Sequence, residues 1–304
     1  MKSFLFTFIV TMSLLANGQN LYIKTYGNQK NKPVIFIHGG PGGNATLFEG
    51  TTAQNLANQG FYVIAYDRRG EGRSTDPNAK FTYEEAFQDL NSIYSKYHLK
   101  KATLIGHSFG GLVATLYTNK YPQNVNALIL AGALFSQQET YDHILNSIKK
   151  IHDGDSKTLN KIAYVEKLDK NSAGYRKHCF DLASDENYFK MPKPTKASKK
   201  LYADYEAGEF FKTNIRNKNA PLVFYQNEKL NNIDTRPILK KIKVAGVPVF
   251  GIYGKDDGIF STKQITSLKE IVGRNHFVII DNCSHYLFVD QQNEFLLNVK
   301  NWIK

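Results

Sequence analysis

The segment Gly106-His107-Ser108-Phe109-Gly110-Gly111 holds a serine between two glycines, in a G-x-S-x-G pattern. It follows an apolar run at 102–106 and precedes a helical pattern that starts at 109, so Ser108 is expected on a sharp turn between a strand and a helix. Glycines two positions either side of the serine let neighbouring backbone pass closely. Near the helix N-terminus, backbone amides favour developing negative charge. This environment suits nucleophilic attack by Ser108 on a carbonyl carbon.

A serine hydroxyl is a poor nucleophile without a general base. In open α/β sheets, catalytic groups gather at the carboxyl ends of the strands. His285 follows the strand pattern at 277–281 and so lies at that end, whereas His276 precedes the same strand. We therefore predict His285 as the base. The histidines expected on helices or in an inserted segment, where solvated or packing roles are typical, are His98, His143, His152 and His178.

Two adjacent carboxylates, Asp256 and Asp257, follow the strand pattern at 247–253. A buried carboxylate at this position would hold the histidine in one tautomer and stabilise the imidazolium. Local spacing does not separate the two aspartates. One of them is predicted to orient His285, and the other to be a solvated turn residue.

The glycine-rich loop His38-Gly39-Gly40-Pro41-Gly42-Gly43 follows another strand pattern, at 33–37. We predict that the backbone N–H groups of Gly40 and Phe109 form an oxyanion hole. The competing interpretation is a dinucleotide site, because residues 40–45 also fit G-x-G-x-x-A and Asp67 ends the next strand. That interpretation leaves the serine, the carboxylates and His285 without a role.

These residues need a parallel sheet to bring them to one edge. Apolar runs with little polar alternation, typical of strands buried on both faces, alternate with helical patterns. We predict an α/β fold with a doubly wound, mostly parallel sheet, built from 19–133 and 241–304, and a helical cap inserted at 134–240. The expected strands are 21–26, 33–37, 61–66, 102–106, 127–132, 247–253 and 277–281, and the expected helices are 45–59, 82–98, 109–120 and 290–303.

The first 18 residues are predicted to be a signal peptide, because Lys2 precedes an apolar stretch that is followed by the small-residue site Ala16-Asn17-Gly18. The stretch is too short for a spanning helix. We therefore expect export to the periplasm or medium and no stable membrane insertion. The net charge of +12 is spread over scattered lysines, a distribution that does not favour a nucleic-acid partner. The two cysteines, Cys179 and Cys283, are expected as buried thiols, with a disulfide as the alternative.

With these motifs in place, the chain resembles the α/β-hydrolase superfamily, and within it the proline iminopeptidase-like branch. The resemblance rests on HGGPGG at 38–43, DRRGEGRS at 67–74 and GHSFGG at 106–111. It implies a catalytic triad of Ser108, Asp257 and His285, and it supports Gly40 in the oxyanion hole. It also implies a structural role for the loop that Asp67 begins.

The resemblance implies a serine hydrolase that cleaves an ester or amide bond, an aminopeptidase of the proline iminopeptidase type. The Gly-His-Ser-Phe-Gly sequence is also typical of esterases and C–C bond hydrolases, so carboxylesterase, lipase-like or C–C hydrolase activity is the alternative, followed by a non-catalytic binding protein on the same scaffold. In the cap, Glu206 and Glu209 are candidates to bind a substrate amine, or are solvated helix residues. We expect a small-molecule or short-peptide substrate and no metal or organic cofactor; the sequence leaves the oligomeric state open.

Overall fold

The computed structural model describes residues 21–304; the predicted signal segment lies outside them. Seven strands form one sheet in the order β1-β3-β2-β4-β5-β6-β7. β1 pairs antiparallel with β3, and all other neighbouring strands are parallel. The predicted mostly parallel sheet is confirmed. The strands are β1 (Ile23–Tyr26), β2 (Lys32–Ile37), β3 (Phe61–Tyr66), β4 (Ala102–His107), β5 (Val125–Ala131), β6 (Val249–Gly254) and β7 (Phe277–Ile280).

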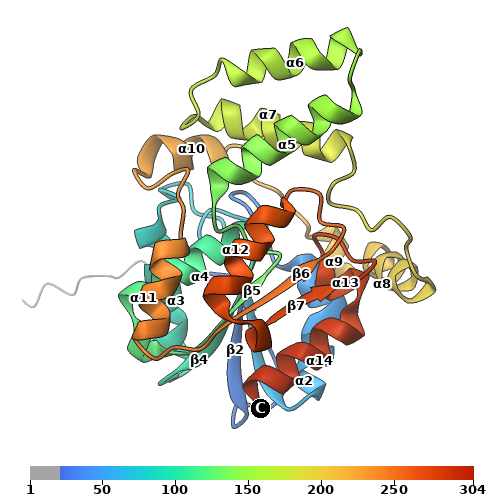
Figure 1. The fold of residues 1–304 in the computed structure, drawn as a ribbon. Helices are drawn as coiled ribbons and strands as arrows, with labels where there is room; N and C mark the ends of the chain where they lie inside the picture. Colours follow the sequence, from blue (N-terminus) through green and yellow to red (C-terminus); the bar gives the residue numbers. More distant parts are fainter. Residues whose placement is uncertain (1–20) are drawn as a thin grey trace, which may run out of the picture.

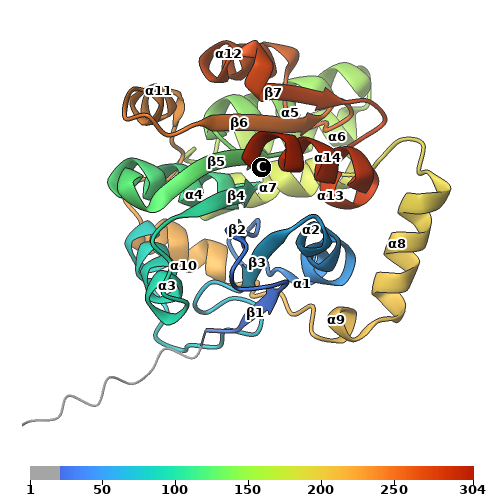
Figure 2. The same cartoon turned by 90° about the horizontal axis from the view of Figure 1, so that it is seen from below.

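Helices cover both faces of the sheet because alternate strand residues point to opposite sides. In β2, Ile35 and Ile37 enter one buried cluster, and Val34 and Phe36 enter the other. Figure 2 shows the two layers of helices on either side of the strands. The first layer contains α3 (Tyr83–Lys96), α4 (Phe109–Lys120), α11 (Arg236–Val244) and α12 (Thr262–Val272); the second contains α1 (Thr46–Phe48), η1 (Glu49–Ala53), α2 (Gln54–Asn58), α13 (Leu287–Asp290) and α14 (Gln292–Ile303).

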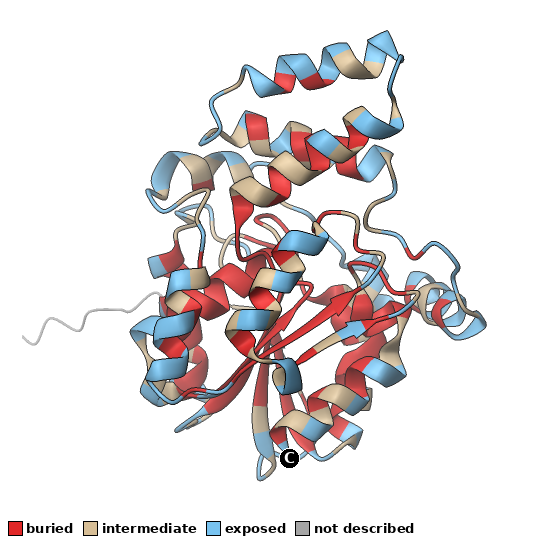
Figure 3. Cartoon of the chain, viewed as in Figure 1, coloured by how far each residue is buried: buried red, intermediate tan, exposed pale blue. Residues whose placement is uncertain are grey.

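The four predicted helices are present, whereas α11 and α12 were not expected from the sequence. Both are short and amphipathic, and each buries few apolar side chains, such as Leu239 and Ile242 in α11. The helix α12 begins with a capping box, in which Ser261 and Gln264 each bond to the other's backbone N–H. The buried residues concentrate in the sheet and on the inner faces of the helices (Figure 3).

Helices also fill the segment between β5 and α11. In Figure 1, α5, α6 and α7 form a layer above the sheet, while α8 and α9 lie to one side of it. α5 and α7 pack against each other, and α8 packs against η1 and α13. The helices are α5 (Gln137–Ile151), α6 (Ser156–Glu166), α7 (Ala173–Asp185), α8 (Lys196–Ala207), α9 (Glu209–Lys212) and α10 (Ala220–Asn227). The cap as a separate domain with boundaries at 134 and 240 stays a prediction.

Candidate active site

Ser108 lies on a tight turn between β4 and α4. Its backbone has φ 53° and ψ −125°, a conformation that non-glycine residues rarely adopt. The flanking glycines make the turn possible: a Cβ on Gly110 would lie 2.1 Å from the carbonyl oxygen of Ile37, and one on Gly106 would lie 2.7 Å from that of Gly110. The sequence thus folds here so that the serine leaves the sheet at the carboxyl end of β4.

His285 and Asp257 form a buried pair on the loops that follow β7 and β6. The His285 Nδ1–H donates to Asp257 Oδ2 at 2.8 Å, and the two residues are 3% and 4% exposed. Asp256 points elsewhere, where its Oδ2 accepts the backbone N–H of Cys283 at 3.3 Å. The structure therefore brings Asp257, and not Asp256, to the histidine, although the two residues are adjacent in the chain.

His107 connects the turn at Ser108 to the loop that carries His285. Its Nε2–H donates to the carbonyl oxygen of His285 at 3.0 Å, and the two rings lie 4.9 Å apart. Burial, together with the charge of His285, lowers the pKa of His107 from 6.5 to about 3, so its ring is neutral. No role for His107 was predicted from the sequence, although its place beside Ser108 in the motif was the available signal.

The glycine-rich loop lies directly beside Ser108. A Cβ on Gly39 would be 3.0 Å from the Ser108 Cβ, so a side chain there would press against the serine. Phe109 is the first residue of α4, and its amide belongs to the helix N-terminus. Gly39, the neighbour of Gly40 in the loop, and Phe109, the first residue of the helix, therefore both adjoin Ser108.

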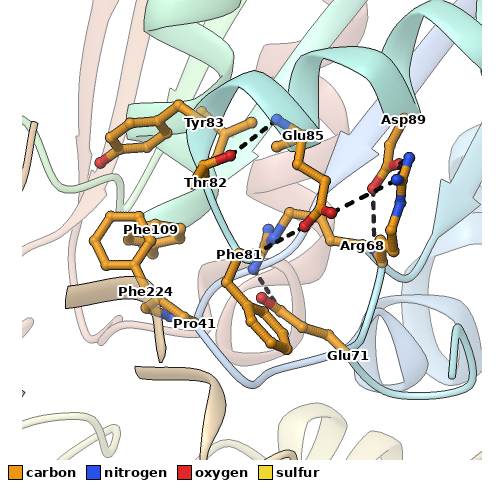
Figure 4. A pocket seen from close by; sticks show the side chains of 13 residues that line it. Pro41, Arg68, Glu71, Phe81, Thr82, Tyr83, Glu85, Asp89, Phe109 and Phe224 are labelled. Atoms are coloured by element: carbon orange, nitrogen blue, oxygen red, sulfur yellow. Dashed lines mark hydrogen bonds and ion pairs between the residues drawn. The ribbon is translucent and has the colours of Figure 1, made fainter. Parts of the chain in front are cut away.

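A buried arginine holds the loop in place. Arg68 donates to the carbonyl oxygens of His38 and Gly39 at 2.5 and 2.9 Å, and to Glu71 at 2.8 Å. Burial raises the pKa of Glu71, and the Arg68 charge opposes that rise. Figure 4 shows Arg68 and Glu71 joined in a small pocket, with Phe109, Phe224 and Tyr83 together on its other side. These contacts of Arg68 with the glycine loop, called the Arg68 clamp below, were not predicted from the sequence.

The dinucleotide interpretation of the glycine loop is wrong, because Asp67, the residue that would bind the ribose, is not accessible. Asp67 is fully buried and accepts hydrogen bonds from the backbone N–H of Ala45 and from the Arg73 side chain. A ribose hydroxyl cannot reach a carboxylate that is buried and already bonded on both oxygens. The Asp67 loop is structural, as the family resemblance implied.

Cys179 and Cys283 are both buried free thiols. Burial raises the pKa of Cys179 to about 12 and also raises that of Cys283. Between residues 21 and 304, no cluster of three potential metal-ligating side chains occurs. None of the helices in the same part of the chain is long and apolar enough to cross a membrane.

Comparison with known proteins identifies the family. A family model described as the alpha/beta hydrolase fold matches residues 32–292. The chain belongs to this family. The sheet, with its helices on both faces, is the α/β-hydrolase fold that the sequence predicted, and the protein is a hydrolase.

Individual proteins similar to this α/β hydrolase include a proline iminopeptidase and, in fold, a proline iminopeptidase-related protein and an esterase. A proline iminopeptidase from Saccharolobus solfataricus is 27% identical over 296 residues, covering 94% of this chain and 89% of the relative. The structure of a proline iminopeptidase-related protein from Thermus thermophilus has a TM-score of 0.65 at 23% identity and covers 92% of both chains. An esterase from Exiguobacterium antarcticum has a TM-score of 0.62 at 20% identity, covering 93% of this chain and 95% of the other. The predicted resemblance to proline iminopeptidases is confirmed.

The two cap glutamates of this α/β hydrolase lie on the outside of the molecule. Glu206 is exposed on α8. The Glu209 side chain is 85% exposed and pairs with Lys212 at 2.5 Å. The structure does not bring either carboxylate to the Ser108 turn. On α8 the buried side is occupied by Tyr205, which bonds to Thr46, and Glu209 begins the separate helix α9 with its side chain in solvent. Their predicted role in amine binding gains no support from these contacts.

Proposed function

We propose that the protein hydrolyses an ester or amide bond through a covalent acyl-enzyme on Ser108. The observation that carries this proposal is the buried His285–Asp257 hydrogen bond on a loop that His107 ties to the serine turn. Asp257 fixes the Nδ1–H tautomer of His285 and leaves Nε2 as the proton acceptor. Oγ of Ser108 attacks the substrate carbonyl carbon while His285 takes the hydroxyl proton.

The remaining steps follow from the same groups. The amides of Gly40 and Phe109 stabilise the negative oxygen of the tetrahedral intermediate. His285 then returns its proton to the leaving amine or alcohol, and the acyl group stays on Ser108. A water molecule, activated by His285, hydrolyses this ester and releases the acid. The Arg68 clamp on the glycine loop keeps Gly40 in position.

For the substrate, we propose aminopeptidase activity of the proline iminopeptidase type. The support is the similarity to proline iminopeptidases over most of the chain. Carboxylesterase activity is the second candidate, and one observation favours it: Glu71 beside the glycine loop is already paired with Arg68, and the predicted cap carboxylates Glu206 and Glu209 are exposed. An amine-terminal substrate therefore finds no carboxylate among these three that is both buried and unpaired.

Turnover of a prolyl-arylamide and of short p-nitrophenyl esters distinguishes the candidates. Peptidase activity predicts release of arylamine, abolished in Ser108→Ala and reduced in Asp257→Asn. Ester turnover without arylamide cleavage would reject the peptidase proposal and leave the esterase. Failure of the purified wild-type protein to turn over either substrate class would count against the whole proposal.

We also propose that the first 18 residues direct export. The support is the order of Lys2, an apolar stretch and a small-residue site at 16–18. Expression of the full chain in a bacterium, followed by N-terminal sequencing of the protein in the periplasmic or medium fraction, tests this. A start near residue 19 is expected; an intact Met1 in the cytoplasmic fraction would refute it.

A further inference from the structure

An arginine from the helices above the sheet reaches the glycine loop. Arg176 lies on α7, and its Nη2 donates to the carbonyl oxygen of Gly40 at 2.7 Å. Gly40 is also the residue whose amide is proposed to bind the oxyanion. The guanidinium of Arg176 is therefore bonded to a residue of the proposed oxyanion hole. A guanidinium has five N–H donors, and this bond uses one of them.

Aromatic rings connect the same arginine to the other side of the site. The Arg176 Cζ lies 5.0 Å from the centroid of the Phe180 ring, and Phe180 stacks on Phe189 at 6.0 Å. Phe189 in turn meets the ring of His285 edge to face at 5.2 Å. Phe180 and Phe189 thus form a continuous row of ring contacts between Arg176 and His285. Contact with Phe180 restricts the guanidinium plane without neutralising its charge.

Arg176 has no anionic partner in the described part of the chain. The ion pairs among residues 21–304 include neither Arg176 nor Arg216, a second arginine whose charge helps to lower the pKa of His107. Four carboxylates that lie beside the glycine loop, His285 or Tyr83 are bonded to other groups. These are Glu71 bonded to Arg68, Asp257 to His285, Asp290 to Ser284, and Glu228 to the backbone of Tyr83 and Leu230.

Three tyrosines surround the arginine with further polar groups. The hydroxyls of Tyr141 and Tyr225 lie 3.2 Å apart, and the buried hydroxyl of Tyr83 has no hydrogen-bond partner. Burial raises the pKa of Tyr83, Tyr141 and Tyr225, and the charge of Arg176 opposes that rise at all three. The surroundings of Arg176 are therefore aromatic and polar, and its guanidinium is not paired with any of these carboxylates, so it is available to bind an anion.

We propose that Arg176 binds a free carboxylate of the substrate, so that the enzyme prefers substrates with a negative charge close to the bond it cleaves. This inference rests on the proposed function at Ser108. A planar guanidinium can bind a carboxylate through two parallel N–H···O bonds. The carboxylate has two possible sources: the C-terminus of a dipeptide, on the leaving-group side, or a terminal acid on the acyl chain of an ester.

The test compares charged and neutral substrates of matched size. The ester arm uses the p-nitrophenyl monoester of glutaric acid against p-nitrophenyl valerate; the peptide arm uses Pro-Ala against Pro-Ala amide. Wild-type kcat/KM is expected to favour the charged member of at least one pair by about 10- to 100-fold, the range for a hydrogen bond to a charged group. The arm that shows the preference identifies the source.

Variants separate substrate binding from support of the loop. Arg176→Gln is expected to abolish the charged-to-neutral preference, and Arg176→Lys to keep part of it. Loss of the bond to Gly40 alone would lower kcat equally for both members of a pair and leave their ratio unchanged. Lys177→Gln is the matched control: it removes a charge from the next residue of α7, whose side chain is 69% exposed and paired with Asp181, and should not change the ratio.

Two outcomes would overturn the inference. One is a wild-type enzyme without preference for the charged member in either arm; the other is a preference that survives in Arg176→Gln. Labelling of Ser108 by a fluorophosphonate probe is measured on the same samples. Normal labelling with no charge preference refutes the role of Arg176 alone, whereas absent labelling of the wild type refutes the proposed function beneath it.

Discussion

Replacement of Arg68 by methionine tests how the glycine loop is held. Arg68 donates to the carbonyl oxygens of His38 and Gly39 and to the Glu71 carboxylate, and its side chain is 5% exposed. Methionine fills a similar volume but has no donors. The substitution therefore frees the two carbonyl groups of the loop and leaves Glu71 buried without a cation.

The expected loss of stability follows from this burial. Removing one partner of a buried ion pair costs about 3–5 kcal/mol, because the other charge stays without compensation. The expected loss of activity follows from displacement of the glycine loop, which carries the Gly40 amide. Removal of an oxyanion donor costs roughly 10²- to 10³-fold in kcat, and a displaced Gly40 amide should cost part of that, about 10- to 100-fold.

The neighbouring Arg69 provides a matched control. It forms a comparable buried pair with Asp89 at 2.7 Å, with side chains 11% and 1% exposed, but it does not bond to the glycine loop. Urea unfolding followed by fluorescence of Trp302, the single tryptophan, measures both losses of stability. Steady-state turnover at a temperature where all variants are folded measures activity.

Arg68→Met and Arg69→Met should both lose stability, and only Arg68→Met should lose about 10-fold or more in kcat. Arg68→Met combined with Glu71→Gln should recover part of the stability, because no buried charge is left unpaired, but not the activity. If Arg68→Met turned over substrate within about threefold of Arg69→Met, the clamp would have no catalytic consequence and the reasoning would be wrong.

Two further predictions concern other buried groups. Because the pKa of His107 falls from 6.5 in the unfolded chain to about 3 in the fold, its contribution to stability is complete above pH 6.5 and is lost as the pH falls toward 3. Between pH 7 and pH 5 the loss is about 2 kcal/mol; a His107→Gln variant should show a smaller drop in urea midpoint over this range, and an equal drop would contradict the neutral ring. Cys179 and Cys283 should not react with a thiol reagent in the native state and should both react in urea; native labelling of either would show that its burial is wrong.

Much of the fold could be predicted because the strands are buried on both faces. Apolar runs such as 61–66 and 102–106 carry that signal directly. The rule that catalytic groups lie at the carboxyl ends of parallel strands then placed Ser108, His285 and the aspartate pair at one edge. The choice between Asp256 and Asp257 came only from family resemblance, because it depends on how the turn after β6 directs two consecutive side chains.

Other parts of the site depend on tertiary packing that no local pattern records. Arg68 and Arg69 are adjacent in one motif, yet the first bonds to the glycine loop and the second to α3. Arg176 reaches Gly40 across 136 positions of sequence, through the packing of α7 above the sheet. For Glu206 and Glu209 the sequence showed only two acidic residues on a helix; which side of α8 and α9 faces the solvent was settled by packing against η1.

The central claim, that Ser108 is the nucleophile, is tested most directly by locating a covalent adduct. The wild-type protein is treated with a fluorophosphonate, digested, and mapped by mass spectrometry, beside Ser108→Ala and His285→Gln. We predict one adduct, on Ser108, absent from Ser108→Ala and formed far more slowly in His285→Gln, since the histidine removes the hydroxyl proton. An adduct on another residue, or labelling that persists in Ser108→Ala, would contradict the account.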